Sequence, residues 1–74
     1  MEKWLNQSRD QKITLEMIYL TNEGTATQRI IRVMKVKESH IIAYCFLKKE
    51  VRTFKKENIL SIYPSYLQKK RKQA

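Results

Sequence analysis

The chain has 74 residues and a formal net charge of +9, from 16 Lys and Arg against 7 Asp and Glu. This length supports a single domain with a thin core. The sequence contains one Cys, one His and one Gly. These counts exclude an internal disulfide, a Cys/His metal cluster and a glycine-rich phosphate loop. We therefore expect a non-enzymatic protein that uses no metal and no cofactor.

The positive charge is concentrated in the last third of the chain. Residues 48–74 contain nine basic and two acidic side chains, whereas residues 1–47 contain seven and five. A concentration of positive charge attracts polyanions in a salt-dependent way. The alternative interpretation of the same composition is a solvated face with a charged tail. The candidate nucleic-acid contacts are Lys48, Lys49, Lys55, Lys56, Lys69, Lys70, Arg71 and Lys72.

Neither a signal peptide nor a membrane span is expected. The N-terminus lacks an apolar stretch, and the longest apolar run, residues 41–47, is too short to cross a bilayer. We therefore predict a cytoplasmic protein without membrane contact. Cys45 lies within this run and is expected to be a small buried hydrophobe.

The first half of the chain predicts a helical segment followed by two strands. Residues 1–12 form the helical segment, in which Trp4 is expected to pack against the core; stacking on a ligand is the alternative. Between residues 12 and 20, Ile13, Leu15, Met17 and Tyr19 alternate with their neighbours, as in a strand with one buried face. Gly24 can adopt the positive φ of a hairpin loop.

The second half predicts three more strands. Residues 25–37 mix apolar and basic side chains on both faces, which indicates a bent strand. Residues 39–54 form a hairpin around a loop at 48–50, and residues 55–58 form a 3₁₀ or helical turn. A last strand, 59–63, ends at Pro64. The expected core consists of Ile13, Leu15, Met17, Ile30, Ile31, Val33, Ile41, Ala43, Cys45, Phe54, Ile59, Leu60 and Ile62.

The predicted fold is mainly β, a small SH3-like or Sm-like five-stranded antiparallel barrel with a short N-terminal helix. The barrel would span residues 13–63, between the helical segment and a basic tail at 64–74. Like-charge runs of the kind found in this tail are usually solvated, and the tail could also serve as a nucleic-acid arm.

Several segments between residues 12 and 62 together resemble the WYL-domain family. They are the alternating run that ends at Tyr19, Arg29 at the start of the second strand, Ile-Ile-Ala-Tyr-Cys at 41–45, and Arg-Thr-Phe at 52–54. The sequence departs from the family at three places. Ser-His-Ile at 39–41 replaces Trp-Tyr-Leu, Val33 replaces a proline, and Asn58 replaces a second arginine.

The resemblance implies an Sm-like barrel that senses a ligand in bacterial and phage transcription regulation, here as a stand-alone, divergent member without a DNA-binding domain. In this family a basic and aromatic surface binds nucleotides or single-stranded nucleic acid. The positions carried over are Arg29 and Arg52 for phosphate or carboxylate, and Tyr19, His40 and Tyr44 for stacking or hydrogen bonding.

Two functions from different classes follow. The first is a WYL-like regulatory module that binds a negatively charged ligand, a nucleotide or single-stranded nucleic acid. The alternative is a protein-interaction module that forms a homodimer or docks on a larger regulator, through a sheet edge or through exposed Ile42 and Phe46.

Overall fold

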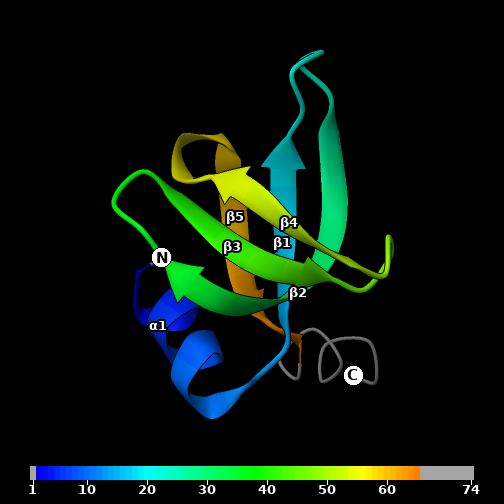
Figure 1. Cartoon of the computed structure of the whole chain (residues 1–74). Coiled ribbons are helices and arrows are strands. Elements are labelled where there is room, and N and C mark those ends of the chain that lie inside the picture. The colour runs from blue at the N-terminus through cyan, green and yellow to red at the C-terminus, as the bar shows by residue number, and fades with distance from the viewer. Residues whose placement is uncertain (1, 66–74) are drawn as a thin grey trace, which may run out of the picture.

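A computed structural model describes residues 2–65 of the chain. Its elements are helix α1 (Glu2–Gln11), strands β1 (Leu15–Leu20), β2 (Ala26–Val36), β3 (His40–Cys45) and β4 (Glu50–Lys55), the 3₁₀ turn η1 (Lys56–Asn58) and strand β5 (Ile59–Pro64) (Figure 1). The predicted class, five antiparallel strands with a short N-terminal helix, is confirmed. Lys69, Lys70, Arg71 and Lys72 of the predicted basic tail lie outside the described residues. Within the described residues, no helix has the length and apolarity needed to span a bilayer.

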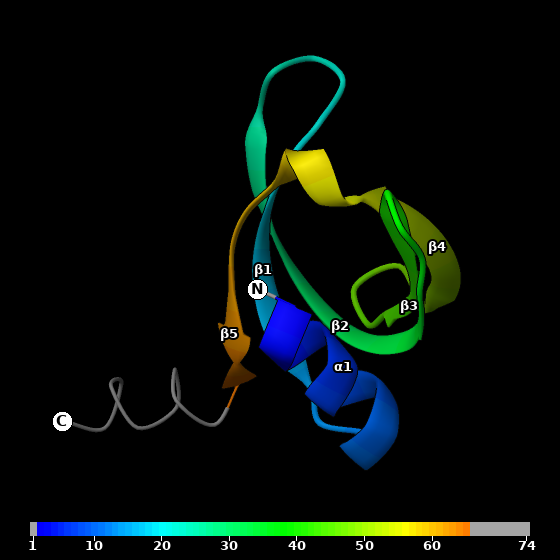
Figure 2. The same ribbon diagram turned by 90° about the vertical axis from the view of Figure 1, so that its left-hand side faces the viewer.

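The strands form one antiparallel sheet in the order β4-β3-β2-β1-β5. The sheet curls into a barrel-like shape with a concave and a convex side (Figure 2). It does not close as the predicted barrel would, because β4 pairs only with β3 and β5 pairs only with β1. Near η1, the Lys55 backbone N–H donates a 3.0 Å hydrogen bond to the Tyr19 hydroxyl, which links the β4 edge to β1.

The hydrophobic core fills the concave side of the sheet. Leu15, Met17, Ile31, Ile41, Ala43 and Cys45 are fully buried there. The predicted inward faces of β1 and β3 are therefore confirmed, as is the burial of Cys45. Leu60 was wrongly predicted to be core and is 54% exposed, because its neighbour Ile59 takes the inward position. Leu5 of α1, which is not among the expected core residues, is completely buried.

Helix α1 is fixed to the sheet by a buried serine. The Ser8 hydroxyl donates to the Ile13 carbonyl at 2.6 Å and accepts from the Val33 backbone N–H at 2.9 Å. Trp4 packs against the core, as expected. Leu5 and Ser8 therefore cover one end of the concave side, where the helix lies across the sheet (Figure 1).

Three local features of the loops and strands can be compared with the predictions. Gly24 adopts a φ of +82° in the β1–β2 loop, as its position predicts. The pairing register of β2 with β3 shifts between Val33 and Lys35, which confirms the predicted irregularity of β2. Strand β3 ends at Cys45 rather than at residue 47, because the chain enters the β3–β4 turn at Phe46.

Candidate functional site

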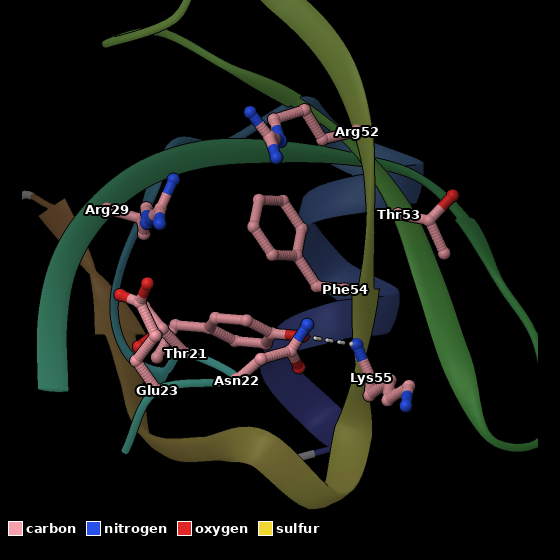
Figure 3. A pocket seen from close by; sticks show the side chains of 9 residues that line it. Thr21, Asn22, Glu23, Arg29, Arg52, Thr53, Phe54 and Lys55 are labelled. Carbon is pink, nitrogen blue, oxygen red and sulfur yellow. Dashed lines mark hydrogen bonds between the residues drawn. The ribbon is translucent and has the colours of Figure 1, made fainter. Parts of the chain in front are cut away.

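A pocket of about 490 Å³ lies on the concave side, between the free edge of β4 and the loop that joins β1 to β2. Its lining residues are Tyr19, Thr21, Asn22, Glu23, Arg29, Arg52, Thr53, Phe54 and Lys55. Strand β4 pairs only with β3, so its other edge is left without a partner strand beside the pocket. Figure 3 shows the side chains of Arg29, Arg52 and Phe54 pointing into the same hollow.

The sheet register explains why Arg29 and Arg52 meet although they are far apart in the sequence. Arg29 lies opposite Met17 in the β1–β2 ladder, and Arg52 lies opposite Ala43 in the β3–β4 ladder. Met17 and Ala43 are both fully buried in the core. Side chains directly opposite each other share a face of the sheet, so both arginines lie on the concave side. Curvature of the sheet then brings β2 and β4 to opposite walls of the pocket (Figure 3).

The two guanidinium groups differ in their partners. Arg29 Nε donates to the Thr27 hydroxyl at 3.2 Å, and within residues 2–65 no carboxylate lies at ion-pair distance from Arg29. Arg52 Nη1 lies 3.2 Å from Glu50 Oε2, with both side chains substantially exposed. An exposed ion pair of this kind is weak. A guanidinium has five N–H donors, so donors of both arginines remain available to an anion.

Two aromatic rings form the apolar wall of the pocket. The rings of Tyr19 and Phe54 meet edge to face, with centroids 5.0 Å apart and an interplanar angle of 76°. Phe54 is only 2% exposed, so its ring mainly supports Tyr19. The Tyr19 hydroxyl accepts the Lys55 N–H and still has its own O–H to donate. The wall therefore offers a partly exposed aromatic ring beside one polar group.

The two remaining ligand candidates lie elsewhere. His40 lines a second hollow of about 310 Å³ with Ser39, Thr53, Lys55 and Glu57. Tyr44 lies on the convex side, where its ring meets Phe46 edge to face at 5.1 Å. The structure thus brings together Tyr19, Arg29 and Arg52 and separates them from His40 and Tyr44.

The described basic candidates are also dispersed. Lys48 and Lys49 lie in the exposed β3–β4 turn, and Lys55 borders both hollows. Lys56 Nζ forms an ion pair with Glu2 Oε2 at 2.8 Å and so joins η1 to α1. These four lysines therefore do not form one continuous phosphate-binding track.

The contribution of the β1–β2 loop to the pocket was not predicted from the sequence. Thr21, Asn22 and Glu23 line it opposite β4, and Figure 3 shows Glu23 across the hollow from Arg52. The loop itself was predicted from Gly24. Its position facing β4 depends on sheet curvature, for which the loop sequence contains no signal.

The fold and the pocket together define a small, curved β-sheet module with a basic and aromatic hollow. Within residues 2–65, no group of three or more His, Cys, Asp or Glu side chains is placed to hold a metal ion. No protein-family model and no curated protein matches this chain.

The structure is similar to that of proteasome accessory factor B/C (PafBC) of Arthrobacter aurescens, with a TM-score of 0.78 and 20% sequence identity. The match covers 85% of this chain but only 11% of PafBC. At this level of identity, the similarity concerns the fold alone.

Proposed function

We propose that this chain is a non-enzymatic, WYL-like regulatory module that binds a negatively charged ligand, a nucleotide or a short single-stranded nucleic acid in the pocket. The observation that carries this proposal is the convergence of Arg29 and Arg52 on one hollow beside Tyr19. The sequence resemblance to the WYL-domain family and the likeness in fold to PafBC support such a role but add no information about the ligand.

The chemistry of the pocket favours a phosphate or carboxylate group joined to a flat organic body. Arginine forks donate paired hydrogen bonds to such anions, and Arg29 has no carboxylate partner in the described part of the chain. Tyr19 supplies a ring edge and a hydroxyl, and Asn22 supplies an amide that can donate and accept. Figure 3 shows the Glu23 carboxylate on the same side of the hollow as Arg29, so this part of the pocket favours a hydroxyl or amino group on the ligand.

The test is a titration of the full chain with labelled single-stranded oligonucleotides and with nucleoside mono- and triphosphates, followed by fluorescence anisotropy or calorimetry at two salt concentrations. Loss of one charged hydrogen bond costs about 1.5–3 kcal/mol, so Arg29→Ala and Arg52→Ala should each weaken binding by roughly 10- to 100-fold. Higher salt should weaken the binding of the wild-type chain.

Arg32→Ala is the matched control. Arg32 lies on the same strand as Arg29 but opposite Tyr44 on the convex side, so its loss removes the same charge outside the pocket. Equal weakening by Arg29→Ala and Arg32→Ala would show that only net charge matters. Binding that is unchanged by both pocket variants would refute the proposal.

A further inference from the structure

The convex side and the turn of the β3–β4 hairpin carry an exposed apolar patch that the pocket does not use. Phe46, Leu47 and Val51 are 41%, 63% and 52% exposed. Tyr44 lies directly opposite Val51 in the ladder and stacks edge to face on Phe46. We call Tyr44, Phe46, Leu47 and Val51 the hairpin patch. Exposed apolar clusters of this kind mark interaction sites.

The hairpin patch is bordered by positive charge. Lys48 and Lys49 are exposed in the turn of the same hairpin, and exposed Arg32 lies opposite Tyr44 on β2. The nearest carboxylate in the sequence, Glu50, pairs with Arg52. Apolar and aromatic side chains bordered by cations that have no ion-pair partner within residues 2–65 match the usual arrangement of a protein interface, with a desolvated centre and a charged rim.

We propose that the hairpin patch docks an acidic, amphipathic segment of a partner protein. The Leu and Phe side chains of such a segment would cover the hairpin patch, while its Asp and Glu side chains would pair with Lys48, Lys49 and Arg32. This inference is independent of the anion pocket, because Tyr44 and Val51 of the hairpin patch lie on the other side of the sheet from Arg29 and Arg52.

Two other occupants fit the hairpin patch less well. A second copy would place Arg32, Lys48 and Lys49 against the same three cations, and like charges across an interface oppose association. Single-stranded nucleic acid binds by stacking bases on exposed ring faces. Leu47 and Val51 have no ring, and Phe46 is already engaged edge to face with Tyr44. The composition of the hairpin patch therefore favours a protein segment.

The experiment uses the full, ¹⁵N-labelled chain and a short fluorescein-labelled peptide in which Asp and Glu alternate with Leu and Phe. A second peptide carries Lys in place of every acidic residue. The acidic peptide should bind and shift the amide resonances of residues 44–51, and the basic peptide should not. The side chains at the centre of an interface carry most of its binding energy, so the double variant Phe46→Ser with Leu47→Ser should weaken binding about tenfold or more.

Leu60→Ser is the matched control, because Leu60 is a similarly exposed apolar residue on β5. It should change peptide affinity by less than about twofold, since surface substitutions outside an interface have small effects. Arg29→Ala should also leave peptide binding unchanged. This variant separates the inference from the proposed pocket function, because it should weaken anion binding in the pocket roughly 10- to 100-fold. If the serine double variant does not fold, the double variant Lys48→Glu with Lys49→Glu replaces it with the same expected loss.

Four results would overturn the proposal. The first two are equal affinity for the acidic and the basic peptide, and an affinity for the acidic peptide that the hairpin variants leave unchanged. The third is loss of peptide binding in Arg29→Ala. The fourth is a shift of the amide resonances of residues 44–51 when a single-stranded oligonucleotide is added but not when the acidic peptide is added. A concentration-dependent doubling of mass that Phe46→Ser with Leu47→Ser abolishes would assign the hairpin patch to a second copy instead.

Discussion

Arg29 and Arg32 lie on the same strand, β2, but on opposite sides of the sheet. Arg29 borders the concave pocket with Tyr19 and Arg52, whereas Arg32 lies beside the hairpin patch opposite Tyr44. The concave side holds the core and a recessed hollow, and the convex side carries the exposed side chains of Arg32, Phe46 and Val51. The comparison shows that one strand can supply two surfaces suited to different partners: a recessed anion on one side and a protein segment on the other.

The largest expected difference between the two sides is in how much the loss of a packed side chain lowers the free energy of unfolding. Phe54→Ala removes a ring that is 2% exposed on the concave side and should lower the free energy of unfolding by about 3–5 kcal/mol. Val51→Ala, on the convex side of the same strand, should change it by no more than about 0.5 kcal/mol. Urea denaturation of both variants measures the difference. Similar losses for the two would contradict the assignment of faces in β4.

A smaller difference in the free energy of unfolding is expected between the loss of a buried and the loss of an exposed serine hydroxyl. Ser8→Ala leaves the buried Val33 N–H and Ile13 carbonyl without their partner, and one unsatisfied buried group costs about 1–3 kcal/mol. Ser61→Ala, at an exposed position of β5, should be close to neutral. Thermal and urea unfolding compare the two. A neutral Ser8→Ala would mean that α1 is held to the sheet by Leu5 and Trp4 without this bridge.

The smallest expected effect concerns the link between β1 and the β4 edge. Tyr19→Phe removes the acceptor of the Lys55 N–H and should lower the free energy of unfolding by about 0.5–1.5 kcal/mol. Exchange of the Lys55 amide hydrogen should become faster, because this N–H then opens to water. Tyr44→Phe on the convex side is the comparison and should leave that exchange rate unchanged. An unaffected Lys55 rate in Tyr19→Phe would show that β4 is held by β3 pairing alone.

Local sequence patterns determined the elements of this protein. Three short-range features each predict their strand or turn correctly. They are the alternation of Leu15, Met17 and Tyr19, the glycine at position 24, and the apolar run from Ile41 to Cys45. The inward position of Arg29 follows from the same alternation once Ile31 is known to be core. These features depend on side-chain direction and backbone preference within a few residues.

Only the tertiary structure decided which residues share a site. The sequence grouped His40 and Tyr44 with Tyr19, Arg29 and Arg52, but the pocket contains only the last three. Burial of Leu5, the position of the β1–β2 loop and the open edge of β4 also could not be predicted from the sequence, because each depends on how strongly the sheet curls. Curvature and register are set by packing between strands distant in sequence, and these long-range contacts determine that Arg29 and Arg52 meet while Arg32 and Tyr44 face the other side.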